Sequence, residues 1–387
     1  MKKTIAILGS TGSIGKSLLK ILQRQKKEFE IVLLTANTNY KELLNQTKKF
    51  KVKNVIITNI NSFIKFKNLN KDRKLKIFNN FETFNKIFKK KVDYSMSSIV
   101  GIDGLKPTIK IIEFTKTIAI ANKESVICGW NLIKKNLKKF KTNFIPVDSE
   151  HFSIWYALQN IDISKVNKIY LTASGGPLLN KSLSKINKIK IKDVLKHPNW
   201  KMGKKITVDS SNLMNKVFEI IEARNIFSLD IEKLSILIHP KSYIHAILIF
   251  NNAMIKVIAH DTTMEIPIFN SVYQNKKIYS KNIVISLKNL NNLNLRLVDQ
   301  NKFKSIKILK MLPNKISLFE TVIVSANDEL VRSYLRKEIR YKDIVLKLHK
   351  IMRLKEFIKL KKITPKKITD IIKLDQYVRL KIKTKSV

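Results

Sequence analysis

A glycine-punctuated stretch near the N-terminus, AILGSTGSIGKSLL at residues 6–19, most constrains how this chain can fold. A short apolar run precedes it and apolar residues then recur at helical intervals, so the pattern predicts a strand, a tight turn and a helix. Gly9, Gly12 and Gly15 would let a ligand approach the backbone closely. The N–H groups of the first helical turn would suit a pyrophosphate. The alternative is a tight turn of an α/β domain that binds nothing.

Strand-like and helix-like segments alternate through the first 150 residues, which predicts an α/β fold with a doubly wound parallel sheet. Beyond the first strand, apolar strand candidates lie at residues 30–36, 54–58, 93–100, 117–120 and 144–147. Ligands of such sheets bind beyond the carboxyl ends of the strands. The polar strings NKES (122–125) and DSE (148–150) fall at two of these ends.

The formal net charge of +47 would by itself suggest a protein that binds nucleic acid. The lysines, however, are spread through nearly every segment and accompany Asn and Ile, as in KKFKVKNVIITNINSFIKFKNLNKDRKLKIFNN at residues 48–80. Codons for these residues are rich in A and T, so a biased genome explains the excess more simply. We therefore expect no nucleic-acid partner, although the positive field would attract anionic substrates.

Cysteine content and hydropathy predict a cytoplasmic protein. Cys128 is the only cysteine, which excludes an internal disulfide and a cysteine-rich zinc site and fits a reducing compartment. No apolar run is as long as a membrane span, and nothing resembles a signal or transit segment. We expect no membrane partner.

The middle of the chain is dense in polar motifs. PVDSEH lies at residues 146–151, TASGGP at 172–177, HPNWKMG at 197–203 and VDSSNLMNKVFEIIEA at 208–223. We expect the carboxylates of Asp148 and Glu150 on one face of an extended segment. Helical spacing should place Asn215, Glu219 and Glu222 on one helix face with Lys216 beside them. Converging carboxylates suit a hard divalent cation, whereas the alternative for each acid is a surface position.

The motifs GSTGSIG, ANKES, PVDSEH, SGGP, HPNW and MNKVFEIIEA, taken in this order, resemble the 1-deoxy-D-xylulose 5-phosphate reductoisomerase family. The resemblance runs from about Lys3 to the C-terminal region. It implies isomerisation of 1-deoxy-D-xylulose 5-phosphate to a branched aldehyde and reduction to 2-C-methyl-D-erythritol 4-phosphate, in non-mevalonate isoprenoid precursor biosynthesis. The implied cofactors are NADPH and Mn²⁺ or Mg²⁺, with Co²⁺ as a further option, and the implied partner is a small phosphorylated sugar.

The resemblance also implies roles for single residues. The metal ligands would be Asp148, Glu150 and Glu219, and with Lys123 these form the expected catalytic group. Ser149 and Lys123 would contact the same substrate oxygens, although Lys123 could instead point to solvent. The substrate phosphate and its surroundings would be bound by Ser174, His197, Ser210, Asn215 and Lys216.

Two of the implied substrate contacts have ordinary structural alternatives. Trp200 would lie on a mobile loop that covers the substrate and excludes water, or it could be core filler. His197 could be a buried histidine before Pro198.

The implied NADPH contacts are Thr11, Gly12, Ser13 and Ile14 in the glycine loop, Asn37, Thr38 and Asn39 after the second strand, and Asn122, Glu124 and Gly203 further on. The family usually has a Gly and a basic residue before an Asn where the adenosine 2′-phosphate lies. This chain has Asn37 and Thr38 before Asn39, which departs from that pattern. HDTTMEIP at residues 260–267 is a second departure that keeps Met264.

We expect an N-terminal Rossmann-like NADPH-binding domain over residues 1–147 and a central α/β catalytic domain over 148–273, through which the family's homodimers pair. The latter has strand candidates at residues 168–172, 234–239, 243–250 and 255–259. An Asn-rich connecting segment, 274–300, precedes a small C-terminal helical domain at 301–387 with helical periodicity at 316–335 and 341–351.

Two other function classes remain open at this point. One is a different NAD(P)-dependent Rossmann enzyme, such as the aspartate-semialdehyde dehydrogenase type, although no cysteine nucleophile stands near the expected place. The other is a basic nucleic-acid-binding module, which net charge favours and the carboxylate cluster disfavours. Consumption of NADPH in the presence of 1-deoxy-D-xylulose 5-phosphate and Mn²⁺ would separate these classes.

Overall fold

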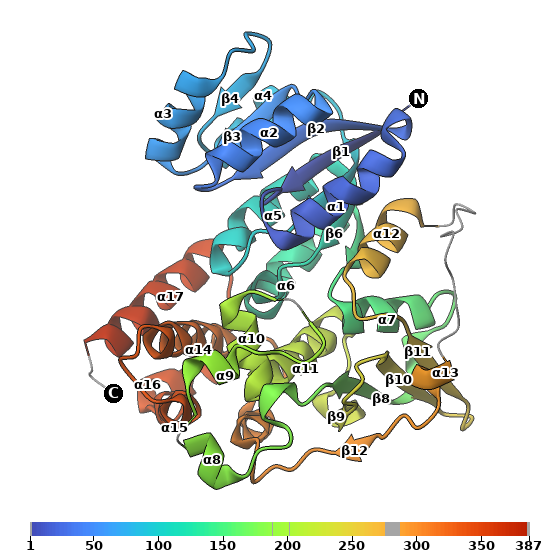
Figure 1. Ribbon diagram of the computed structural model, residues 1–387, viewed down its shortest axis with the longest axis vertical. Coiled ribbons are helices and arrows are strands. Elements are labelled where there is room, and N and C mark those ends of the chain that lie inside the picture. Colours follow the sequence, from blue (N-terminus) through green and yellow to red (C-terminus); the bar gives the residue numbers. More distant parts are fainter. Residues whose placement is uncertain (1, 188, 201, 275–286, 385–387) are drawn as a thin grey trace. The chain divides into compact units, whose positions relative to one another are not determined.

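The computed structural model describes residues 2–187, 189–200, 202–274 and 287–384, and the chain forms two compact units (Figure 1). Unit 1 contains the described residues of 1–125, 131–148 and 264–278. Unit 2 contains those of 126–130, 149–263 and 279–387. No helix within the described ranges is long and apolar enough to cross a membrane.

Unit 1 is built on a seven-stranded parallel sheet with the strand order β4-β3-β2-β1-β5-β6-β7. The strands are β1 (Lys3–Leu8), β2 (Phe29–Ala36), β3 (Asn54–Ile57), β4 (Lys76–Phe78), β5 (Val92–Ser97), β6 (Thr115–Ile120) and β7 (Asn143–Pro146). The predicted doubly wound α/β fold is confirmed, and the six strands predicted from the sequence are present within a few residues. β4 is a three-residue edge strand in the lysine-rich region that was not predicted from the sequence.

Helices connect the parallel strands of unit 1, because such strands need crossover connections. They are α1 (Ser13–Arg24), α2 (Tyr40–Phe50), α3 (Ile60–Leu69), α4 (Phe84–Ile87), α5 (Leu105–Ile112) and α6 (Lys123–Lys139). The last four residues of β1 are completely buried, as expected for a strand covered on both faces. The carboxyl ends of the strands lead into the segments predicted to bind a cofactor.

The glycine loop between β1 and α1 is fixed by close packing. A Cβ on Gly15 would lie 2.5 Å from the Ser10 Cα, so no larger residue fits without opening the turn. The buried Ser10 hydroxyl donates to the Gln46 side-chain oxygen at 2.8 Å, and the Gln46 amide donates back to the Ser10 carbonyl at 3.1 Å. These contacts hold the loop against α2.

Helix α12 (Glu265–Tyr273) belongs to unit 1 rather than to the central domain in which its residues were expected. The Ser271 and Tyr94 hydroxyls are hydrogen-bonded at 2.8 Å, and the Lys3 ammonium donates to the Val272 carbonyl at 2.6 Å. The Phe29 and Tyr273 rings meet edge to face, with centroids 5.6 Å apart. The chain therefore leaves the central region several residues before position 273.

Unit 2 contains a five-stranded mixed sheet with the order β11-β10-β8-β9-β12, in which β8 and β9 are parallel and the other neighbours antiparallel. Its strands are β8 (Val166–Ala173), β9 (Leu234–Ile238), β10 (Ile244–Phe250), β11 (Ile255–Ala259) and β12 (Arg296–Leu297). The four predicted strands are present. β12 comes from the expected connecting segment 274–300, of which residues 275–286 lie outside the described residues.

The helices of unit 2 fall into an early and a late group. The early group is α7 (Ser149–Ala157), α8 (Leu183–Asn187), α9 (Ile191–Val194), α10 (Lys204–Ser211) and α11 (Met214–Phe227). After the short α13 (Leu287–Leu290), the late group is α14 (Phe319–Leu335), α15 (Tyr341–Met352), α16 (Lys355–Ile358) and α17 (Ile368–Lys383), gathered in orange and red in Figure 1. The predicted C-terminal helical region is thus observed.

A buried ion pair joins the late helices to α11. The Arg224 guanidinium lies 2.6 Å from a Glu320 carboxylate oxygen and also donates to the Pro313 carbonyl at 2.9 Å. Both charged side chains are almost completely buried. The C-terminal helices therefore pack as part of unit 2 rather than as a separate appendage.

One local prediction is wrong. The DSE string was expected to be extended, but α7 begins at Ser149, so Glu150 lies in the first turn of a helix. The Ser153 hydroxyl donates to the Ser149 carbonyl at 2.7 Å within that helix. Strand β7 ends at Pro146, and the polar residues that follow it begin the next helix, as they commonly do.

Candidate active site

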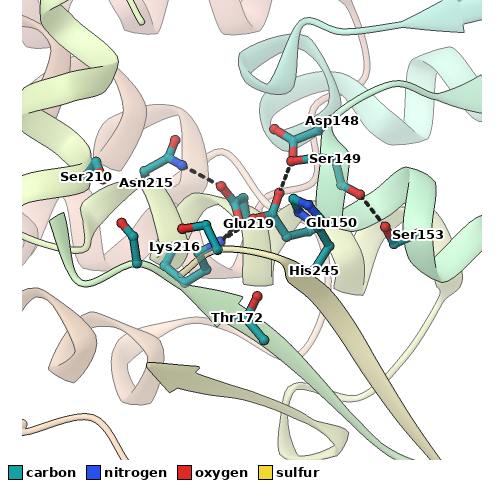
Figure 2. A network of polar contacts seen from close by, with 12 residues as sticks. Asp148, Ser149, Glu150, Ser153, Thr172, Ser210, Asn215, Lys216, Glu219 and His245 are labelled. Carbon is teal, nitrogen blue, oxygen red and sulfur yellow. Dashed lines mark hydrogen bonds and ion pairs between the residues drawn. The ribbon is translucent and has the colours of Figure 1, made fainter. Parts of the chain in front are cut away.

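The centre of the site is a cluster of two carboxylates and a lysine in unit 2, in which Lys216 and Glu219 are buried and Glu150 is partly buried (Figure 2). Glu150 from α7 points toward Lys216 and Glu219 from α11. The Lys216 ammonium lies 2.8 Å from Glu150 Oε1 and also pairs with Glu219, three residues along its own helix. Burial by itself would lower the pKa of Lys216, but the two carboxylates raise it above its ordinary value. Lys216 is therefore firmly charged.

The predicted helix face of α11 is partly confirmed. The Asn215 side-chain amide donates to Glu219, as the spacing indicates. Glu222 lies one turn further along and points to a different partner, since its carboxylate is 3.5 Å from His151 Nδ1. His151 Nε2 donates to the Glu219 carbonyl at 2.8 Å, so this completely buried histidine ties α7 to α11.

Asp148 stands one residue before α7, and its carboxylate is 2.9 Å from the Lys123 ammonium at the start of α6. One carboxylate oxygen each from Asp148, Glu150 and Glu219 lie within 4.8 Å of one another. Mg²⁺ and Mn²⁺ prefer oxygen ligands at roughly 2.0–2.2 Å, so ligand atoms around one such ion lie up to about 4.4 Å apart. The donor set, three carboxylates, therefore suits a hard divalent cation, and the 4.8 Å limit on its spacing is close to this range.

A second group combines two hydroxyls and a histidine. His197 Nε2 lies 3.1 Å from both the Ser174 and the Ser210 hydroxyl oxygens. Its Nδ1 accepts the backbone N–H groups of Asn199 at 3.2 Å and Trp200 at 2.9 Å. Because Nδ1 is an acceptor, the proton of the neutral ring is on Nε2 and faces the hydroxyls.

The residues predicted to bind the substrate phosphate thus form two separate hydrogen-bonded sets. Ser174, His197 and Ser210 are hydrogen-bonded to one another, whereas Asn215 and Lys216 bond to the carboxylates. Figure 2 shows Ser210 on the same side of the network as Asn215 and Lys216.

Trp200 stands against a pair of stacked histidines that the sequence analysis did not single out. The His245 and His260 rings are stacked with centroids 3.7 Å apart, and the Trp200 ring meets His245 edge-on at 6.1 Å. Burial and the neighbouring His260 lower the pKa of His245 to about 3. His245 lies in an apolar strand with no motif around it, so only the structure reveals it, whereas His151 closes the PVDSEH motif and could have been noticed.

The residues expected to bind NADPH lie in unit 1, except Gly203, which is the N-cap of α10 in unit 2. Thr11, Gly12, Ser13 and Ile14 form the end of the glycine loop and the first residues of α1, with Gly12 at the N-cap. Helix α6 begins with Asn122 and Glu124, and the Asn122 side chain caps it by accepting the Ser125 N–H at 2.7 Å.

The segment after β2 is held mainly by neutral groups. Asn37 accepts a hydrogen bond from the Thr58 hydroxyl at 3.2 Å, and Asn39 caps α2 by accepting the Glu42 N–H at 3.3 Å. The Thr38 carbonyl accepts from the Ser62 hydroxyl at 3.1 Å. The basic side chain expected here in relatives is absent from these three positions.

Three models of known protein families match the chain. The 1-deoxy-D-xylulose 5-phosphate reductoisomerase model matches residues 5–129, and two models of the C-terminal domain of that enzyme match residues 144–227 and 261–381. The 1-deoxy-D-xylulose 5-phosphate reductoisomerase of Pelagibacter ubique is 60% identical over the full length of both chains.

Solved structures agree with the sequence comparison. A DOX-P reductoisomerase in complex with NADPH, fosmidomycin and magnesium has a TM-score of 0.90 at 28% identity, covering 99% of this chain and 97% of the other. The 1-deoxy-D-xylulose 5-phosphate reductoisomerase of Zymomonas mobilis, in complex with NADPH, has a TM-score of 0.87 at 27% identity, covering 98% of each chain. The chain belongs to the 1-deoxy-D-xylulose 5-phosphate reductoisomerase family.

The charge state of His197 can be tested directly. Burial lowers the pKa of His197 to about 4, below the ordinary value of 6.5. The ring should therefore stay neutral down to about pH 5. The unfolded chain binds a proton at His197 at a higher pH than the folded chain does, so this histidine should lower the stability of the folded protein as the pH falls from 6.5 toward 4. Proton NMR titration of the ring C–H signals, with the His197→Gln variant for assignment, measures this. A midpoint above pH 6 for His197 would contradict the geometry.

Proposed function

We propose that Asp148, Glu150 and Glu219 hold the divalent cation with which this family converts 1-deoxy-D-xylulose 5-phosphate to 2-C-methyl-D-erythritol 4-phosphate. The observation that carries the proposal is the convergence of three carboxylates, from the residue before α7, the first turn of α7 and the middle of α11. When bound, the cation would coordinate the ketone and hydroxyl oxygens of the sugar and stabilise the negative charge that develops during carbon–carbon rearrangement.

The chain's own residues would then orient the sugar and move protons. Lys123, whose ammonium lies 2.9 Å from Asp148, would stabilise or protonate a substrate oxygen. The Ser149 hydroxyl donates to Glu150 Oε2 at 2.6 Å and fixes that carboxylate, and it could turn to a substrate hydroxyl. Lys123 contacts Asp148 and Ser149 contacts Glu150, so each group is bonded to one of the proposed metal ligands.

The phosphate of the sugar would be bound by Ser174, His197, Ser210, Asn215 and Lys216. The hydroxyls, the Nε2–H of neutral His197 and the Asn215 amide supply donors for a phosphate oxygen. Lys216 would supply the charge, because a cation held by Glu150 and Glu219 would balance the carboxylates that Lys216 now neutralises. Trp200, packed on the His245 ring, would cover the sugar and exclude water.

NADPH would bind unit 1 with its pyrophosphate at Thr11, Gly12, Ser13 and Ile14 and the start of α1, where the helix N-terminus favours an anion. Asn37, Thr38 and Asn39 would lie at the adenosine 2′-phosphate, and Asn122, Glu124 and Gly203 would complete the contacts. The domain limits 1–147, 148–273, 274–300 and 301–387 remain our proposal for the functional regions, although α12 packs in unit 1.

We expect Glu150→Gln to lower turnover by at least about a hundredfold, because it removes a charged metal ligand. Mn²⁺ affinity, measured by calorimetry, should fall with it. NADPH affinity should stay within twofold of the wild-type value, since the glycine loop is untouched.

Glu232→Gln is the matched control, because Glu232 is an exposed acid of the same unit. It should change neither Mn²⁺ affinity nor turnover. Wild-type Mn²⁺ affinity in Glu150→Gln would overturn the metal assignment, and joint loss of Mn²⁺ and NADPH affinity would indicate misfolding.

We expect Thr38→Lys to widen the preference for NADPH over NADH by roughly tenfold, about 1.4 kcal/mol from one charge-assisted contact. The gain should shrink at high salt, because the site is exposed. The measurement is kcat/KM for each cofactor at low and high salt. Asn143→Lys, at the amino end of β7, adds the same charge elsewhere in unit 1 and should leave the ratio unchanged. An unchanged ratio in Thr38→Lys would show that this side chain does not face the 2′-phosphate.

We propose that two copies of the chain pair through the sheet of unit 2, and that the protein works in the cytoplasm without nucleic-acid or membrane partners. The edge strand β11 and the turn before it expose Met254 (64%), Ile255 (56%) and Val257 (48%), beside a hollow of about 520 Å³ that Phe250 also lines. So much exposed apolar surface on a sheet edge favours burial by a partner.

Sedimentation velocity tests the pairing. Wild-type protein should sediment as a species of twice the 44.9 kDa chain mass, and Val257→Glu should shift it toward the monomer. A monomer at micromolar concentration for the wild type would refute the proposal.

A further inference from the structure

The segment DSSN, residues 209–212, ends α10 and leads into α11, and it carries Ser210. Ser210 faces the candidate phosphate site, with its hydroxyl 3.1 Å from His197 Nε2. The three other residues of the segment are each hydrogen-bonded to a different element of the C-terminal region.

Asp209 is completely buried and is bound from α14. Its carboxylate accepts a hydrogen bond from the Asn327 side-chain amide at 2.8 Å and lies 3.2 Å from the Lys205 ammonium. Lys205 also lies 3.5 Å from Asp328, which in turn accepts from Arg379 of α17 at 2.9 Å. A chain of charged contacts thus links α10 to α14 and α17.

Ser211 and Asn212 are bound by two further elements. The buried Ser211 hydroxyl is hydrogen-bonded to the Tyr341 hydroxyl at 2.9 Å, at the start of α15. The Asn212 carbonyl accepts from the Ser305 hydroxyl of a 3-10 helix, Lys304–Met311. The C-terminal region is therefore hydrogen-bonded to the residues before and after Ser210 in the sequence.

The opposite side of the segment is closed by the SGGP loop. Gly176 has a φ of +65°, and a Cβ there would lie 2.7 Å from the Ser210 carbonyl oxygen. Ser174 in the same loop bonds His197, the partner of Ser210. The segment has no room to shift toward this loop, and the C-terminal contacts prevent it from moving away.

We propose that the C-terminal helical region acts as the positioning frame of the phosphate-binding segment, with Asp209, Ser211, Asn327 and Tyr341 as positioning residues. This inference rests on the proposed function, which places Ser210 at the substrate phosphate. A hydroxyl recognises phosphate only within narrow limits of distance and angle, so loosening its backbone weakens ground-state binding of the sugar. None of the positioning side chains needs to touch the substrate.

Two neighbouring tyrosines provide a matched test. Tyr341 and Tyr334 have buried rings in edge-to-face contact, with centroids 5.7 Å apart. The Tyr341 hydroxyl bonds Ser211, whereas the Tyr334 hydroxyl has no hydrogen-bond partner among the described residues. Phenylalanine at either position deletes one oxygen from the same aromatic pair, but only Tyr341→Phe releases the segment.

Tyr341→Phe should raise KM for 1-deoxy-D-xylulose 5-phosphate about three- to tenfold, the range expected for one lost buried hydrogen bond. The inhibition constant of inorganic phosphate should rise in parallel, while kcat and KM for NADPH stay within twofold. Tyr334→Phe should leave all four values unchanged. Ser211→Ala should raise this KM at least as much, because it also removes the bond from the Ser211 hydroxyl to the Val208 carbonyl. Adding Tyr341→Phe to Ser211→Ala should cause no further increase, because the bond between the two hydroxyls is already lost.

Ser210→Ala distinguishes a failure of the proposed phosphate site from a failure of the positioning frame. If it raises KM for the sugar phosphate but Tyr341→Phe behaves like Tyr334→Phe, the positioning frame is overturned and the phosphate site stands. If Ser210→Ala leaves that KM unchanged, the phosphate assignment fails and the frame fails with it. A fall in kcat without a change in KM in Tyr341→Phe would also overturn the inference. Melting temperatures of all variants identify any that are unfolded.

Discussion

The contact of Lys216 with Glu150 and Glu219 is the interaction on which the candidate active site depends. Burying a charged group costs several kcal/mol unless an opposite charge compensates it, and here α7 and α11 each bring charge to a buried place. Since Lys216 and Glu219 are three residues apart, α11 presents both to Glu150 at once. Two carboxylates against one ammonium leave an excess of negative charge, so the packing that joins these helices also provides a site that favours a further cation.

Much of the architecture could be predicted because the sheet strands carry their signal locally. Strands such as β1 and β2 are short apolar runs, and the sequence predicts their limits within a few residues. β4 was missed because three residues in a Lys- and Asn-rich stretch carry little pattern. The helical start at Ser149 and the place of α12 depend on contacts with distant segments, such as Tyr94 with Ser271, which local periodicity cannot contain.

The candidate site shows the same division between local and distant information. Glu150, Lys216 and Glu219 could be chosen from motifs, because their spacing and residue types already suggest a chemistry. His245 could not be chosen from the sequence, because it lies in an apolar strand and only the structure shows its ring against Trp200 and His260. Likewise, no sequence pattern distinguishes Tyr341 from Tyr334. Only the structure shows that the Tyr341 hydroxyl is hydrogen-bonded to Ser211 and that the Tyr334 hydroxyl has no partner among the described residues.

The membership of α12 in unit 1 has a consequence for how the chain acquires its structure during synthesis. All seven strands of the parallel sheet are made by residue 146, yet the helix that covers Phe29 and bonds Tyr94 is made more than a hundred residues later. Until then the part of the sheet around Phe29 and Tyr94 lacks this helix, and apolar surface exposed during synthesis can attract chaperones or other chains. The N-terminal unit is therefore complete only after most of the central region has been synthesised.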